Sequence, residues 1–80
     1  MTFMFEVYYK PPPDPARESA LTQRVAAFGG HLDCREVPDD REIGGICLTY
    51  EFDDEELASN AASLLRGLGE HVEGPVDYAE

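Results

Sequence analysis

The chain has 80 residues, and its 17 Asp and Glu against six Lys and Arg give a formal net charge of −11. This length predicts one domain, residues 1–80, with one modest core. The charge excludes binding to nucleic-acid phosphates and disfavours anionic membranes, because both interactions need a basic surface. It is better suited to a basic partner or a cation.

No apolar stretch approaches the roughly 20 residues of a membrane span, and the N-terminus lacks the pattern of a signal peptide. A cytoplasmic location is therefore expected.

Residues 2–10 alternate between apolar and mixed positions, which predicts a half-buried strand. Pro11 to Pro13 end the strand because proline cannot donate ladder hydrogen bonds. Asp14 is the expected cap of a helix that Pro15 begins and that ends at Gly29-Gly30. The expected apolar stripe of this helix comprises Leu21, Val25 and Phe28, flanked by Ala20, Ala27 and the stem of Arg24.

Residues 31–37 form the weakest predicted strand, and their charges are typical of a sheet edge. A polar loop over 38–42, closed by Gly44-Gly45, leads to a strand over 46–52. This strand repeats the alternation of residues 3–9. Its core-facing residues are expected to be Ile46, Leu48, Tyr50 and Phe52.

Asp53 is the expected cap of the second helix, with Glu56 three residues later as in a capping box. Gly69 ends the helix, and the last strand runs over 71–78. Pro75 confines this strand to an edge or a bulge. The expected buried stripe of the helix is Leu57, Ala61, Leu64, Leu65 and Leu68.

The two halves of the chain repeat each other, since residues 28–33 correspond to 68–73. The order β-α-β-β-α-β with right-handed crossovers predicts a four-stranded antiparallel sheet, strand order 4-1-3-2, with both helices on one face. The apolar strands are central and the charged or proline-containing strands are edges. This pattern resembles the ferredoxin-like α+β fold over the whole chain, a fold that serves many functions.

The histidines and cysteines give no site. His31 and His71 are expected on opposite edges, roughly 14 Å apart, which is too far to share a metal ion. Cys34 is expected in the core and Cys47 on the helix-free face, so that both remain reduced thiols. A bulge in the second strand would overturn this arrangement. Acidic neighbours also make Cys47 a poor nucleophile.

Glu6 and Glu51 are candidates for a general acid/base pair, but without a pocket two carboxylates on a surface are normally solvated. The sequence has no Cys-x-x-Cys and no glycine-rich loop between a strand and a helix. We therefore predict a protein that is not an enzyme and that has no metal and no cofactor.

The best candidate for function is the helix-free face of the sheet. Its only central aromatic residue is Tyr8, and its acids argue against RNA binding. We expect an interaction face for a protein partner or for a homodimer that Tyr8→Glu or Thr49→Arg would dissociate. The candidate residues are Met4, Glu6, Tyr8, Cys47, Thr49 and Glu51. Lys10 extends the face, with His31, Asp33 and Arg35 expected at one edge and His71, Glu73 and Asp77 at the other.

The alternative hypothesis is a regulatory domain that resembles the ACT type. ACT domains have the same order of elements and bind amino acids between paired domains. The loop after the first strand departs from that type, because it is rich in proline rather than glycine.

Overall fold

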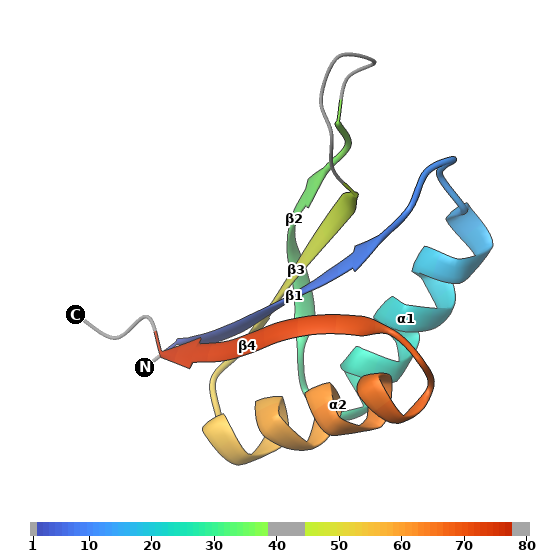
Figure 1. Ribbon diagram of the computed structural model, residues 1–80. Coiled ribbons are helices and arrows are strands. Elements are labelled where there is room, and N and C mark those ends of the chain that lie inside the picture. Colours follow the sequence, from blue (N-terminus) through green and yellow to red (C-terminus); the bar gives the residue numbers. More distant parts are fainter. Residues whose placement is uncertain (1, 39–44, 78–80) are drawn as a thin grey trace.

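The computed structural model describes residues 2–38 and 45–77. The chain forms a four-stranded antiparallel sheet of order β2-β3-β1-β4, with two helices on one face (Figure 1). This is the ferredoxin-like βαββαβ fold, and the predicted strand order is confirmed. The elements are β1 (Phe3–Tyr9), α1 (Pro15–Ala27), β2 (His31–Glu36), β3 (Ile46–Phe52), α2 (Glu55–Gly67) and β4 (His71–Asp77).

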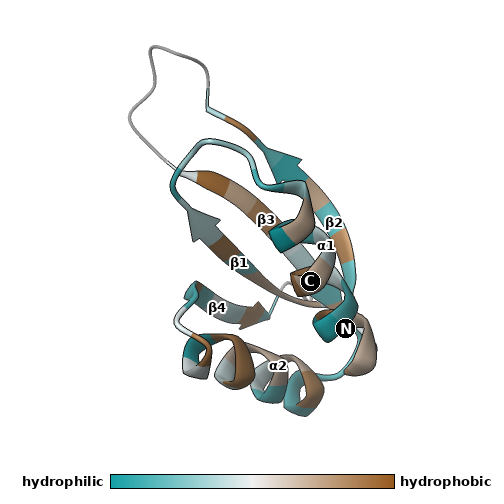
Figure 2. Ribbon diagram, turned by 90° about the vertical axis from the view of Figure 1, so that its right-hand side faces the viewer, coloured by the Kyte–Doolittle hydropathy of each residue, from teal (hydrophilic) through white to brown (hydrophobic). Residues whose placement is uncertain are grey.

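The core lies between the two central strands and the helices. Alternate residues of β1 are buried, and the core-facing residues of β3 are also buried, as their alternation predicts. The ring of Phe5 packs against Tyr50 and Phe52, with centroid distances of 5.8 and 5.3 Å. Figure 2 shows hydrophobic residues along β1 and β3. Burial of these aromatic rings stabilises the fold through the hydrophobic effect and ring packing.

Helix α1 begins as predicted. The Asp14 side chain accepts a hydrogen bond from the backbone N–H of Arg17 at 3.0 Å, and Pro15 takes the first helical position. Leu21 and Val25 face the core, and Phe28 is partly buried against it. The alanines at positions 20 and 27 remain exposed.

Helix α2 begins one residue later than predicted. Asp54, not Asp53, is the cap, and its carboxylate accepts a hydrogen bond from the backbone N–H of Leu57 at 3.1 Å. The sequence has two adjacent aspartates, and the extended backbone of Asp54 makes it the cap.

The buried stripe of α2 also differs from the prediction. Of the expected residues, only Ala61 and Leu65 are buried; Leu57, Leu64 and Leu68 are exposed by 40%, 39% and 50%. The helix turns its small side chains to the sheet, where they belong to the same core cluster as Phe5 and Phe52. Its buried residues are Ala58, Ala61, Ala62 and Leu65.

Strand β2 is an edge strand, as predicted, and it contains a bulge. Residues 32 and 34 pair with Tyr50 and Thr49, so one extra residue of β2 lies between them. The bulge moves Cys34 to the helix-free side and Arg35 to the helix side. The expected placements of Cys34 in the core and of Arg35 on the helix-free face are therefore wrong.

Strand β4 has a similar irregularity at Gly74-Pro75. Its register with β1 shifts so that Val76 lies opposite Met4, while Asp77 lies opposite the core residue Phe3. Asp77 was expected on the helix-free face and does not lie there; Val76 takes that position. The predicted loop over 39–44 and the end of the last strand at Tyr78 lie outside the described residues.

Candidate functional site

The helix-free side of the sheet, here called the open face, brings the six candidate residues together. The register of β1 with β3 places Met4, Glu6 and Tyr8 opposite Glu51, Thr49 and Cys47, respectively. Residues opposite each other in an antiparallel pair share a face. The candidate residues therefore form three adjacent cross-strand pairs at the centre of the open face, and neither helix covers them (Figure 1).

Glu6 is the centre of a small hydrogen-bond network on this face. One of its carboxylate oxygens accepts hydrogen bonds from the Tyr8 hydroxyl at 2.9 Å and from the Cys47 thiol at 3.2 Å. The hydrogen bond to Glu6, together with burial, raises the pKa of Tyr8 well above its ordinary value. The network holds both donors in their protonated forms at neutral pH.

The exposures of the two cysteines are the reverse of those predicted. Cys34 is exposed, and Cys47 is buried although it lies on the open face. Burial, followed by the hydrogen bond to Glu6, raises the pKa of the Cys47 thiol. A buried, protonated thiol is a poor nucleophile, so the arrangement gives no thiolate chemistry.

Glu6 and Glu51 do not act as a pair. Each has a separate partner: Glu6 binds the network just described, and the carboxylate of Glu51 lies 3.9 Å from the ring nitrogen of His31. Register also separates them, because Glu6 lies opposite Thr49. The geometry does not provide the two facing carboxylates that general acid/base catalysis needs.

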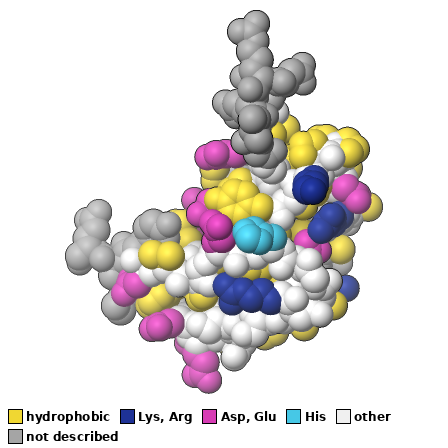
Figure 3. Space-filling model, in the orientation of Figure 1, with side chains coloured by type: hydrophobic (Ala, Val, Ile, Leu, Met, Phe, Trp, Pro, Cys, Tyr) yellow, Lys and Arg dark blue, Asp and Glu magenta, His cyan; other side chains and the backbone are white. Residues whose placement is uncertain are grey.

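The histidines lie on opposite edge strands, as predicted. The ring of His71 meets Tyr8 edge-on with centroids 5.9 Å apart, and its ring nitrogen is 3.4 Å from Glu73. In Figure 3 a histidine lies beside acidic and hydrophobic side chains. Within residues 2–38 and 45–77, no three His, Cys, Asp or Glu side chains are grouped as metal ligands would be.

The bulges add residues to the open face that periodicity alone did not place there. Glu36 lies opposite Cys47, Cys34 lies opposite Thr49, and Val76 lies opposite Met4. The positions of these three residues follow from the irregular strand register. In the sequence, Gly74-Pro75 is the one feature that indicates an irregularity, and it concerns β4 alone. Four glutamates now share the face with two histidines, so it is acidic: Glu6, Glu36, Glu51 and Glu73.

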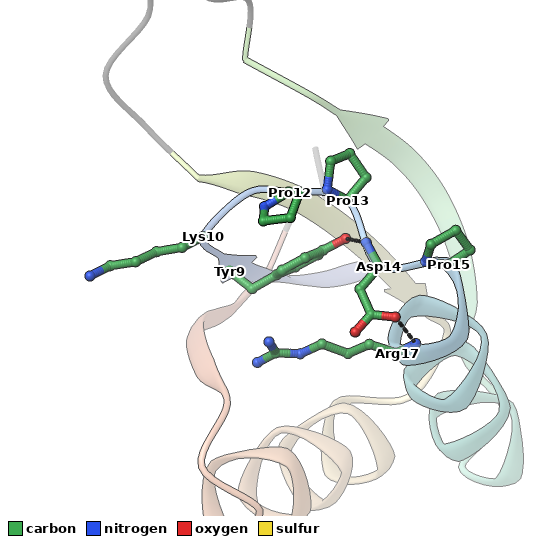
Figure 4. Close-up of a pocket in the computed structure, with 7 residues that line it drawn as sticks. All are labelled: Tyr9, Lys10, Pro12, Pro13, Asp14, Pro15 and Arg17. Atoms are coloured by element: carbon green, nitrogen blue, oxygen red, sulfur yellow. Dashed lines mark hydrogen bonds between the residues drawn. The ribbon is translucent and has the colours of Figure 1, made fainter.

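A pocket of about 420 Å³ lies elsewhere, between the end of β1 and the start of α1 (Figure 4). The Tyr9 hydroxyl accepts a hydrogen bond from the backbone N–H of Asp14 and donates one to Glu18. The guanidinium of Arg17 lies 4.9 Å from the centre of the Tyr9 ring and forms an ion pair with Glu70. Lys10 points away from the pocket in Figure 4. These side chains are hydrogen-bonded or ion-paired with one another and join β1 to α1 and to the turn after α2. The residues that line the pocket therefore have a structural role.

A scan against protein-family models and a search of curated proteins gave no match. Among solved structures, an amidase of the hydantoinase/carbamoylase family from Burkholderia multivorans is similar, with a TM-score of 0.47 and 12% sequence identity. The likeness covers 99% of this chain and 28% of that one. At this distance it does not bear on what the present chain binds or does. No helix within the described residues is long and apolar enough to cross a bilayer.

Proposed function

We propose that the protein is a non-catalytic, cytoplasmic protein-interaction module that docks a partner protein on its open face. The observation that carries the proposal is the uncovered centre of the sheet, where Met4, Tyr8 and Thr49 are half-buried on their own strands and have no helix above them. A partner would complete their burial. The two free cysteines suit a reducing compartment.

The charge of the open face favours a partner with basic groups. Glu6, Glu51 and Glu73 lie on three adjacent strands. Among the described strand residues on this face, His31 and His71 are the only basic side chains. A symmetric pair formed through the open face would set these carboxylates against their copies, which costs free energy. Arg or Lys side chains of a different protein would instead pair with them.

The test is quantitative binding with a matched control. The wild type and Thr49→Arg are used as baits in an extract of the native cell, captured proteins are identified, and affinities are measured with the purified partner. Thr49→Arg should weaken binding at least about tenfold, since it fills the centre of the surface with a charge. Ser63→Arg, an equal change on the exposed side of α2, should leave the affinity unchanged. Equal affinity for all three proteins would refute docking on the open face.

Ligand sensing of the ACT kind remains the alternative function. It predicts that at least one of the twenty amino acids raises the melting temperature, because a ligand that binds only the folded state stabilises it. No shift with any amino acid at millimolar concentration would remove this alternative and leave the interaction module.

A further inference from the structure

The helix layer carries a second apolar surface, separate from the open face. Leu57 and Leu64 of α2 and Leu68, the residue that caps its C-terminal end, are exposed by 40%, 39% and 50%. Residues four and seven apart lie on one side of a helix, so these three leucines form a continuous row, here called the leucine row. Single exposed leucines are ordinary, but an aligned row is typical of a surface that packs against another helix.

The leucine row faces the groove between the two helices. At one end, the side chain of Leu57 lies beside Gly29, just after α1. At the other end, Leu68 lines a pocket of about 250 Å³ together with Ala20, Leu21 and Arg24 of α1. The space between the two helices is therefore open at the Leu68 end. Hydrophobic residues are visible along α2 in Figure 2.

The spacing of apolar residues along α2 is the same in both directions. Leu57, Ala61, Leu64 and Leu68 are separated by four, three and four residues. In an antiparallel pair of identical helices centred between residues 62 and 63, Leu57 of one copy therefore lies against Leu68 of the other. The two Leu64 side chains then lie on either side of the two-fold axis, while Ala61 stays buried in the core of its own copy. A two-fold interface requires such self-complementarity, because the same patch is used twice.

The charges at the ends of the row are also complementary. Asp53 and Glu56 are exposed beside Leu57, at the start of α2. Arg24 lies beside Leu68, and within residues 2–38 and 45–77 no carboxylate is paired with it. Two-fold antiparallel pairing would bring the acidic end of each copy to the Arg24 of the other, twice per dimer. Opposite charges at such positions fix the orientation of paired helices.

We propose that a second copy of this chain occupies the groove, through antiparallel pairing of α2 with its counterpart. This proposal does not rest on docking at the open face. It leaves that face free on both copies, so one dimer would present two docking surfaces pointing away from each other. Bivalence of this kind raises the avidity for a repetitive or dimeric partner.

The experiment is sedimentation equilibrium from micromolar to millimolar concentration at about 0.15 M salt, where charges beyond about 8 Å are largely screened. The wild type should form dimers. Leu64→Glu should raise the dimer dissociation constant by about two orders of magnitude or more, because each dimer loses two leucines and gains two carboxylates near the contact. Circular dichroism should show a folded monomer, since Leu64 is already solvent-exposed.

Val76→Glu is the matched control, because it replaces an exposed apolar residue on the open face with the same charge. It should leave the dimer intact. Arg24→Glu should weaken the dimer, and adding Glu56→Arg should restore it, which only pairing between copies explains. A monomeric wild type at every concentration would overturn the proposal, and so would a dimer that Tyr8→Glu dissociates and Leu64→Glu does not. Neither result affects the binding test for the open face.

Discussion

The two faces of the sheet are built from the same strands, and yet they differ in burial and in polarity. On the helix side, Phe5 and Tyr50 are at most 1% exposed. One residue along, Glu6 and Thr49 are only half-buried and take part in polar contacts. Since successive side chains alternate between faces, a single strand can supply core residues on one face and the residues of the proposed interaction surface on the other. This difference in burial distinguishes residues that stabilise the fold from residues whose replacement should change its stability little.

The strongest test of this separation is a pair of truncations on β1. Phe5→Ala should lower the free energy of unfolding by about 3–5 kcal/mol, because it leaves a cavity between two aromatic rings. Met4→Ala, one residue away on the open face, should cost less than about 1 kcal/mol. Urea denaturation measures both. Similar losses would mean that the open face contributes to stability as much as the core does.

Gly30, which follows α1, and Gly67, at the end of α2, show the same contrast between a packed and an exposed position. A Cβ at Gly30 would lie 2.6 Å from the Val25 side chain and even closer to the ring of Phe52. Gly30→Ala should therefore destabilise the protein by about 1–3 kcal/mol through overpacking. The backbone at Gly67 has open space around it, so Gly67→Ala should stabilise α2 by about 0.5–1 kcal/mol. Thermal unfolding of dilute samples checks both signs, and a stabilising Gly30→Ala would contradict the packing.

The reactivities of the two cysteines report how accessible the centre of the open face is to solvent. Cys34 should react with a thiol reagent at least about tenfold faster than Cys47, because Cys47 is buried and its pKa is raised. The rates are followed in Cys34→Ser and Cys47→Ser variants, each with one thiol left. Equal rates would show that the Glu6 network opens readily.

The smallest expected effect concerns the ion pair between β2 and α1. Arg35 lies 2.6 Å from Glu18 and lowers the pKa of that carboxyl below its usual 4.5. A lowered folded-state pKa stabilises the protein above the unfolded pKa and loses this effect as pH falls through the folded value. Arg35→Gln should thus lower the melting temperature slightly at pH 7, and the difference from wild type should vanish once the pH falls below the lowered folded-state pKa of Glu18. A difference that persists at acid pH would point to packing of the Arg35 stem instead.

The regular parts of the chain could be predicted because their signals are local. The alternation along residues 3–9 and 46–52 and the Asp14-Pro15 start each depend on neighbouring residues alone. The central position of the two apolar strands follows from the same pattern. The six candidate residues were placed on one face by counting in twos along two unbroken strands.

Where a bulge interrupts the alternation of side chains along a strand, the prediction from sequence failed. The bulge at Asp33 moved Cys34 and Arg35 to the other sides of the sheet, and nothing in the six residues of β2 marks it. The leucines of α2 were assigned to the core by hydrophobicity, yet the space beneath the helix admits alanines. Leu57 and Leu64 consequently lie outside, where they form the proposed pairing surface.

By itself, the order of residues determined the element types, the strand order and which strands are central, because periodicity, caps and glycine stops act over a few positions. The tertiary structure alone decided which thiol is buried, which leucines stay exposed and which carboxylates share a surface. Those outcomes depend on how much volume the opposing side chains leave and on where a ladder skips a residue, and both arise only when distant segments meet.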